Sequence, residues 1–155
     1  MLTDRQKEIF NLLREWLEEE FGKTEMIEQE DVTFLRVLPP LFVEGEERVI
    51  TDICLYEYMD EITVAQIYTT IALEIESAAD ALRARLPEWN FVSLAGSYGI
   101  YDKLGQLYHK QNIALIHDAA VDDQVDFLFS GFCLALDEIA QHYPEILTIV
   151  RGETV

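Results

Sequence analysis

The stretch Asp122–Tyr143 constrains the fold of this chain more than any other part of its sequence. Its apolar residues recur at steps of three and four, the spacing that lines one face of an α-helix. Asp122 and Asp123 suit the positive start of such a helix, and Pro144 predicts its end. We therefore predict a helix here that closes the hydrophobic core. The apolar residues are Val125, Leu128, Phe129, Phe132, Leu136, Ile139 and Tyr143.

This helix carries more apolar surface than one buried face requires. Phe127 and Leu134 lie on its flank, which indicates a second contact. Gly131 costs about 1 kcal/mol in a helix relative to alanine. Its presence predicts tight packing at this point, either within one chain or across a dimer.

Length and composition predict a single domain over residues 1–155. With 155 residues and a hydrophobic fraction of 50%, the chain can bury a true core. No apolar run approaches the roughly 20 residues of a membrane helix, and charges interrupt the first 20 residues, so we expect no secretory signal and a cytoplasmic location. Cys54 and Cys133 are isolated, which favours buried, reduced thiols over a disulfide or a zinc site.

The net charge of −19 excludes several classes of partner. Nucleic acids and anionic membranes would be repelled, and two long segments, Arg48–Arg83 and Lys110–Arg151, have no lysine or arginine between their ends. Two interpretations remain. Either the charge serves solubility alone, or it attracts a basic polypeptide partner.

The first half of the chain predicts a helix and three strands. Thr3 and Gln6 form a capping-box pattern, so we predict a helix from Thr3 to Phe21 that stops at Gly22. The acidic stretch Glu25–Asp31 is interpreted as a solvated connection. The predicted strands are Val32–Leu38, ended by two prolines, and the hairpin Arg48–Tyr58 and Ile62–Ile71; the mixed segment Leu41–Glu47 is a predicted loop.

The second half of the sequence indicates two helices with another hairpin between them. From Glu74 the apolar period becomes helical, and this helix is expected to end before Pro87. Phe91–Tyr101 and Gln106–His117 have strand composition and are joined by a short turn that contains Gly105. Connections this short allow only antiparallel pairing. The predicted fold is therefore α+β, an antiparallel five-stranded sheet with the order α-β-β-β-α-β-β-α.

This order of elements, in a small and strongly acidic chain that ends in a long amphipathic helix, resembles the type III secretion chaperone-like fold, including the YbjN-type bacterial proteins. The resemblance covers nearly the whole chain, but it lies in element order and charge and not in a motif. It implies a homodimer that binds polypeptide segments without chemistry, or a regulator in the YbjN branch. No residue role can be transferred from it, and fold alone does not establish function.

One segment approaches a catalytic motif. Ala95–Gly99 differs from the G-x-S-x-G nucleophile elbow only in its first residue, with Ser97 in the place of the nucleophile. An elbow needs a strand that turns sharply into a helix, whereas another hairpin is predicted here. We therefore interpret the glycines as positions of a bulge or a close approach.

No set of residues predicts a metal or cofactor site. His109 and His117 would lie about 26 Å apart along one strand. Glu138 and His142 are one helical turn apart and offer only two ligands, which is too few. A further group of aspartates fits helix capping better than an EF-hand, and no glycine-rich phosphate loop occurs; the aspartates are Asp118, Asp122, Asp123 and Asp126.

Surface recognition is therefore the favoured function. Five tyrosines fall in predicted strands, where they either form a binding surface or merely cover half-buried sheet. We predict a non-enzymatic, homodimeric protein-binding module without cofactors. The alternative is a small ligand-binding domain or hydrolase with a pocket near Ser97 and Tyr98. The predicted protein-binding residues are Tyr56, Tyr58, Phe127, Gly131 and Leu134.

Overall fold

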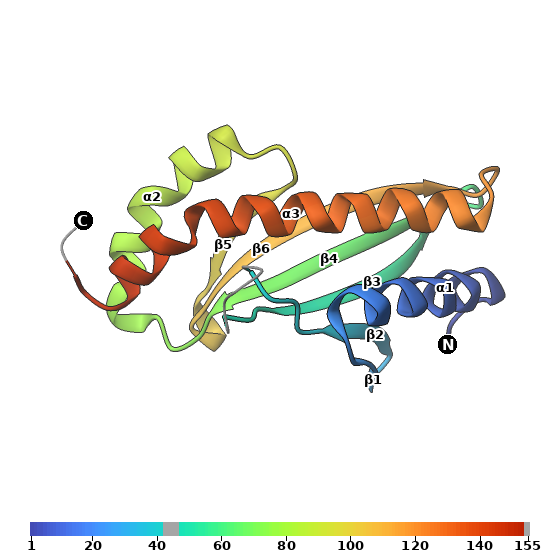
Figure 1. Cartoon of the computed structure of the whole chain (residues 1–155), viewed down its shortest axis with the longest axis horizontal. Coiled ribbons are helices and arrows are strands. Elements are labelled where there is room, and N and C mark those ends of the chain that lie inside the picture. The colour runs from blue at the N-terminus through green and yellow to red at the C-terminus, as the bar shows by residue number, and fades with distance from the viewer. Residues whose placement is uncertain (42–46, 154–155) are drawn as a thin grey trace.

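The protein folds into three helices packed on one face of a six-stranded antiparallel sheet (Figure 1). A computed structural model describes residues 1–41 and 47–153. The helices are α1 (Asp4–Phe21), α2 (Ala79–Val92) and α3 (Val121–Val150), with short 3-10 turns η1 (Glu76–Ala78) and η2 (Asp102–Leu104). The strands are β1 (Thr24–Gln29), β2 (Val32–Val37), β3 (Ile50–Tyr58), β4 (Ile62–Ala72), β5 (Ser97–Tyr101) and β6 (Gln106–Ile116).

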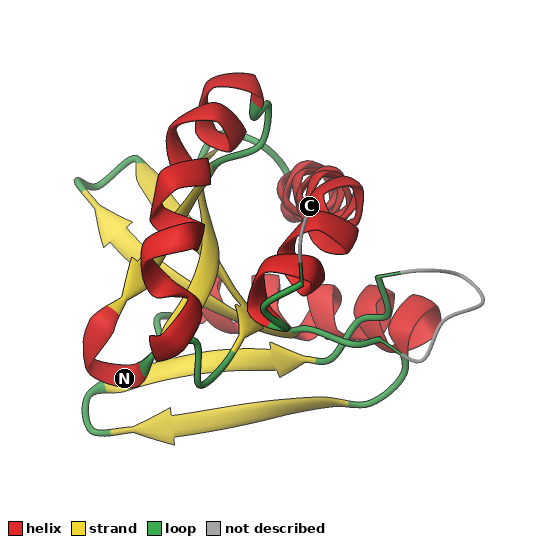
Figure 2. Ribbon diagram, turned by 90° about the vertical axis from the view of Figure 1, so that its left-hand side faces the viewer, coloured by secondary structure: helices red, strands yellow, loops and turns green. Residues whose placement is uncertain are grey.

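The sheet has the order β1-β2-β3-β4-β6-β5, and every neighbouring pair is antiparallel. This confirms the α+β class and the antiparallel pairing. Helix α3 runs along the sheet, with α1 beside one part of it and α2 near its C-terminal end (Figure 1). Figure 2 looks along α3 and shows the twisted sheet curving around this helix.

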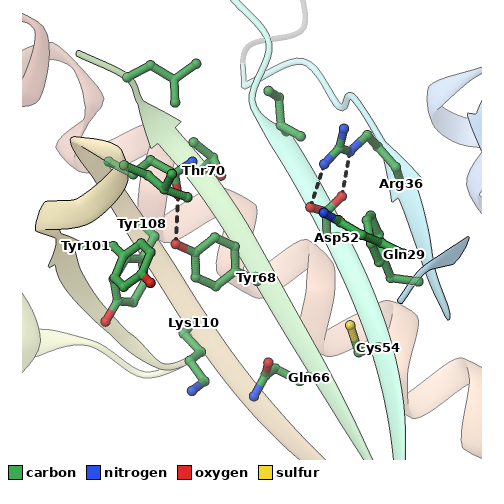
Figure 3. A pocket seen from close by; sticks show the side chains of 15 residues that line it. Gln29, Arg36, Asp52, Cys54, Gln66, Tyr68, Thr70, Tyr101, Tyr108 and Lys110 are labelled. Atoms are coloured by element: carbon green, nitrogen blue, oxygen red, sulfur yellow. Dashed lines mark hydrogen bonds and ion pairs between the residues drawn. The ribbon is translucent and has the colours of Figure 1, made fainter. Parts of the chain in front are cut away.

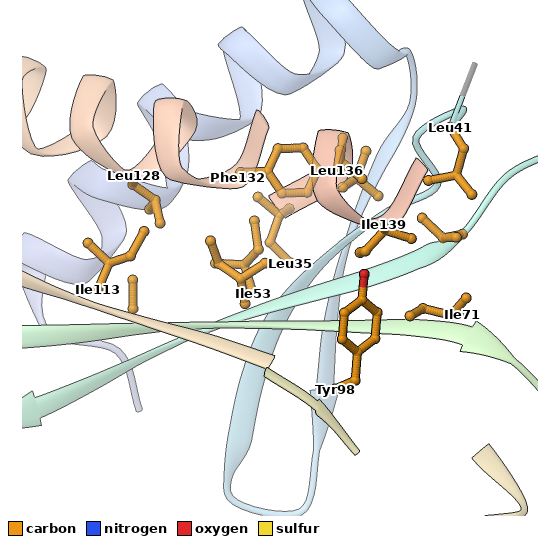
Figure 4. Packing of buried hydrophobic residues seen from close by; sticks show 14 of the residues in the cluster. Leu35, Leu41, Ile53, Ile71, Tyr98, Ile113, Leu128, Phe132, Leu136 and Ile139 are labelled. Atoms are coloured by element: carbon orange, nitrogen blue, oxygen red, sulfur yellow. The ribbon is translucent and has the colours of Figure 1, made fainter. Parts of the chain in front are cut away.

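The core lies between the sheet and the helices. Leu35 and Ile53 point from the strands toward Leu128 and Phe132 of α3, and all four are fully buried (Figure 4). The seven residues predicted to form the apolar face of the terminal helix are buried or pack against this cluster, whereas Phe127 and Leu134 on its flank are exposed. The prediction that this helix closes the core is therefore confirmed.

Helix α1 begins and ends as its sequence predicts. The Thr3 hydroxyl accepts a hydrogen bond from the Gln6 N–H at 3.1 Å, and the Gln6 side-chain oxygen accepts one from the Thr3 N–H at 2.9 Å. At the other end Gly22 has φ +88°, a conformation that side-chain-bearing residues rarely adopt. The helix then leads directly into β1.

The prediction of five strands is wrong, because the acidic stretch Glu25–Asp31 is mostly a strand. Thr24 and Met26 of β1 turn toward the core, whereas Glu25 is exposed, and Gln29 pairs with Val32 across a two-residue turn. Strand β1 is an edge strand. Charged side chains are common on such strands because they discourage pairing with other chains, and this makes them look like loops in a sequence.

Contrary to the prediction, neither Pro144 nor Pro87 ends a helix. Pro144 lies inside α3, which continues to Val150 because Ile146 and Ile149 are buried in the core. Pro87 likewise lies inside α2, where Trp89 is 1% exposed. Tertiary packing of the following turns offsets the backbone hydrogen bond that each proline removes.

Two other predicted boundaries shift. The helix expected from Glu74 begins at Ala79, after η1, and Phe91 and Val92 belong to α2 rather than to a strand, so β5 starts only at Ser97. The predicted loop Leu41–Glu47 lies largely outside the described residues. Its two described ends are joined by a hydrogen bond from the Leu41 N–H to the Glu47 carbonyl at 3.0 Å.

Candidate functional site

The sheet has one face without helices. Side chains alternate along a strand, so Thr51, Ile53 and Leu55 of β3 face the core, while Asp52 and Cys54 face the opposite side. The cross-strand register places Phe34, Gln66 and Asn112 on that opposite side as well. We call this surface the open face. Its central residues are half-buried by their neighbours.

The open face is hollowed where β2, β3, β4 and β6 pass one another. The concavity has a volume of about 570 Å³ and is open to solvent (Figure 3). Its lining is mostly aromatic and polar and includes Phe34, Arg36, Asp52, Tyr68, Tyr101, Tyr108 and Lys110. We call it the sheet hollow.

An ion pair and a tyrosine stack define the two sides of the sheet hollow (Figure 3). Arg36 donates two hydrogen bonds to the Asp52 carboxylate, at 2.7 and 2.9 Å. The rings of Tyr68 and Tyr108 stack at 4.9 Å, and the Tyr68 hydroxyl donates to the Gln106 side-chain oxygen at 3.0 Å. Burial raises the pKa of Tyr68 to about 12, so its hydroxyl remains a neutral donor at physiological pH.

Tyr56 and Tyr58 lie on the open face but outside the sheet hollow. They are 43% and 57% exposed. The register sets Tyr56 opposite Val64, and Tyr58 opposite Ile62, which in turn pairs with Ile116. These two predicted residues therefore belong to an apolar patch at the far end of the sheet.

The three predicted residues of α3 form one stripe beside β6. Phe127 and Leu134 are 66% and 41% exposed. Gly131, between them, packs within the chain: a Cβ added to it would come within 2.5 Å of the Ile113 side chain. The tight packing expected at Gly131 is thus an internal contact with the sheet, and the structure leaves Phe127 and Leu134 at the surface.

A buried polar cluster occupies the space where the second predicted site would lie. The Glu138 carboxylate accepts hydrogen bonds from the Ser93 hydroxyl at 2.7 Å, from the Ala95 N–H at 3.1 Å and from the Leu94 N–H. Tyr98 is 4% exposed, and its hydroxyl lies 2.9 Å from His142 Nδ1. Its ring packs against Trp89, His109 and His142.

The arrangement around Ser97 is not a nucleophile elbow. Ser97 is exposed and begins β5, which continues as a strand to Tyr101 and then enters the short turn η2. No helix follows the serine directly, so the geometry that would present it beside oxyanion donors is lacking. Tyr98 points the other way, into the core.

The histidines and acids do not gather into a metal site. Within residues 1–41 and 47–153 no group of three or more potential ligands comes together. Glu138 is hydrogen-bonded to the loop between α2 and β5. His117 lies 2.8 Å from the Thr63 hydroxyl, and buried His109 is at the other end of the sheet. Cys54 and Cys133 are free thiols and half-buried.

We expect buried His109 to make the folded protein less stable in mild acid. Burial lowers the pKa of His109 below its ordinary value of 6.5, although Glu138 opposes this with its carboxylate 3.7 Å from Nε2. The unfolded chain therefore binds a proton near pH 6.5 that the folded chain binds only at lower pH. We expect the free energy of unfolding to fall as pH decreases from about 7, by at most about 1.4 kcal/mol per pH unit for one proton.

Urea titrations between pH 7.5 and pH 5.5 would measure this slope. A His109→Gln variant has no titrating group at this position, so its slope should be flatter whatever its absolute stability. An equal slope in both proteins would contradict the assignment to His109. Carboxylates do not interfere with this measurement, because they titrate at lower pH. The pKa of Glu145, for example, is lowered by a hydrogen bond from Arg85.

None of the helices among the described residues is both long enough and apolar enough to span a bilayer. No protein-family profile matches the chain, and no curated protein matches it either. A similar solved structure is that of YbjN, a proposed transcription regulator from E. coli. The two chains are 18% identical, the match covers 88% of this chain and 92% of that one, and the TM-score is 0.52. The expected resemblance is thus confirmed for the fold.

Proposed function

We propose that this chain is a non-enzymatic, cytoplasmic protein, chaperone- or regulator-like, that works as a homodimer and binds a segment of another polypeptide. The observation that carries the proposal is the sheet hollow, a solvent-open concavity of about 570 Å³ on the helix-free face. Tyrosines supply contact area with a polar tip and lose little entropy on binding, which suits them to protein recognition. The fold shared with YbjN is compatible with this role.

The charge of the protein favours a basic segment. The net charge of −19 attracts cationic chains over several ångströms and speeds their association. Within the sheet hollow, Arg36 neutralises the Asp52 carboxylate. The rings of Tyr68 and Tyr108 can take a lysine or arginine head by cation–π contact. The apolar lining at Phe34 and Ile50 can take an adjacent aliphatic side chain.

A binding series with matched tyrosine variants would test the proposal. Immobilised peptides of varied composition would be screened with the wild type, and the tightest binders measured by fluorescence anisotropy. Tyr108→Ala, inside the sheet hollow, should weaken binding about tenfold, and binding should weaken further as salt is added. Tyr58→Ala, exposed but outside the hollow, is the matched control and should have little effect.

The same measurements can refute the surface or the function. If Tyr58→Ala weakens binding and Tyr108→Ala does not, the apolar patch binds the peptide and the sheet hollow does not. If no peptide binds the wild type more tightly than it binds Tyr108→Ala, polypeptide recognition by the sheet hollow is wrong.

A small-molecule ligand is the second candidate, because the volume of the sheet hollow falls within the range of about 300–1,000 Å³ typical of such sites. We therefore propose the open face for this ligand site, in place of the pocket expected near Ser97. A thermal-shift screen of small aromatic cations would test it. Stabilisation that Tyr108→Ala abolishes would support a ligand site, and an unchanged melting temperature with every compound would reject it.

A further inference from the structure

One half of strand β6 has no strand on its outer side among the described residues. Strand β5 pairs only with Gln106–Lys110, so Gln111–Ile116 pairs with β4 alone. We call this segment the β6 edge. An unpaired strand edge presents backbone N–H and C=O groups that can extend the sheet into another chain.

The directions in which the backbone N–H and C=O groups of the β6 edge point follow from their alternation along the strand. The Lys110 carbonyl faces β5, because it lies directly against Gly96. The His117 N–H faces the other way, since it donates to the Glu61 carbonyl at 2.9 Å. Even-numbered residues therefore direct their N–H and C=O outward, which leaves those of Asn112 and Ala114 at the edge.

Apolar side chains flank the β6 edge. Ile116 is 58% exposed, and Ala114, Ile116 and Phe127 line a small, mainly apolar hollow of about 220 Å³ between the strand and α3. The polar residues in its lining are Asp123 and Gln124. Leu134 continues this surface along α3, which lies over β6. The edge therefore combines free hydrogen-bonding groups with an apolar wall.

The two edges of the sheet differ in charge. Strand β1, at one edge, exposes Glu25 and Glu28, which disfavour pairing with another acidic chain. The β6 edge has no charged residue from Gln111 to Ile116. In a chain with a net charge of −19, a neutral, apolar edge of this kind is a place where two copies can meet with little repulsion.

We propose that the β6 edges of two copies pair antiparallel around a two-fold axis and join the two sheets into one. Asn112 of each copy hydrogen-bonds to Ala114 of the other, and Ile113 meets its own counterpart. Lys110, at one end of the edge, pairs with Ser97 of β5, so the pairing between the two copies spans Gln111–Leu115.

The stripe on α3 fits the same symmetry. Gly131 contacts Ile113, so a two-fold axis at Ile113 passes near Gly131. Phe127 and Leu134 lie one turn to either side of this point, so Phe127 of one copy faces Leu134 of the other. The homodimer of the proposed function thereby acquires a definite surface, and both sheet hollows lie on the same face of the joined sheet.

Light scattering after size-exclusion chromatography would test the pairing over a range of protein concentrations. The wild type should be dimeric. Ala114→Pro should be monomeric, because it removes an outward N–H without removing a bond to β4. Phe127→Lys should also shift the chain to monomer by removing an apolar contact and adding charge. Leu104→Lys, on the 60% exposed Leu104 of η2, is the control and should stay dimeric.

Circular dichroism and thermal melting would establish that each variant is folded. If Ala114→Pro is unfolded, the oligomeric state of Phe127→Lys alone tests the proposal. A monomeric wild type would overturn the proposal, as would folded Phe127→Lys and Ala114→Pro proteins that remain dimeric. Peptide binding by the sheet hollow is measured separately, so a failed dimer test leaves that part of the proposed function standing.

Discussion

Replacing Phe132 by alanine should lower the free energy of unfolding by about 3–5 kcal/mol. Phe132 is fully buried at the centre of α3, and its ring meets that of Phe21 edge-on at 5.6 Å. Figure 4 shows it beside Leu136 on the helix and facing Leu35 and Ile53 of the sheet. Alanine would leave a cavity under the helix that closes the core, and the close packing around it allows only partial collapse.

Urea unfolding followed by circular dichroism would measure this loss at a fixed protein concentration. Phe91→Ala is the matched control, because Phe91 is 90% exposed and the same substitution removes almost no buried surface. Its effect should stay within about 0.5 kcal/mol. If Phe132→Ala were no more destabilising than Phe91→Ala, α3 would not close the core in solution.

Glu138→Ala should also lower the free energy of unfolding, by about 2–4 kcal/mol. The Glu138 carboxylate is the common acceptor for Ser93, Leu94 and Ala95, which form the connection from α2 to β5. Glu138 is 8% exposed and Ala95 4%, so water has poor access to the donors that alanine would leave without a partner. Unsatisfied buried donors cost about 1–3 kcal/mol each.

Glu138→Gln separates hydrogen bonding from charge. Glutamine keeps one acceptor oxygen in nearly the same place, so it should lose clearly less stability than alanine. Hydrogen exchange should show faster exchange at the Leu94 and Ala95 amides in Glu138→Ala before any global change. Equal stability of the two variants would mean that the carboxylate does not hold the loop.

Local signals predicted most of the fold correctly. The capping pair Thr3 and Gln6, the glycine stop at Gly22 and the three-residue connection after Tyr58 each act within a few residues, and each is present in the structure. The errors arise where distant contacts outweigh local preference. Pro144 is a helix breaker by itself, yet burial of Ile146 and Ile149 keeps the next turns helical.

The candidate surfaces were only partly predictable. Tyr56, Tyr58, Phe127 and Leu134 are exposed as a binding role requires, because their apolar character exceeds what one buried face can use. The sheet hollow was missed. Arg36 and Asp52 are far apart in the chain and form their ion pair only because β2 and β3 are in register. The spacing of Tyr68 and Tyr108 gave no hint of their stacking.

The sequence by itself determined the class of elements, their order apart from β1, the amphipathic faces that form the core and the unusual charge. These properties follow from periodicity and composition, which are local along the chain. Only the tertiary structure decided which face of the sheet stays uncovered, where that face is hollowed and which strand edge is left unpaired. These depend on register and helix placement, which bring residues together that are distant in sequence.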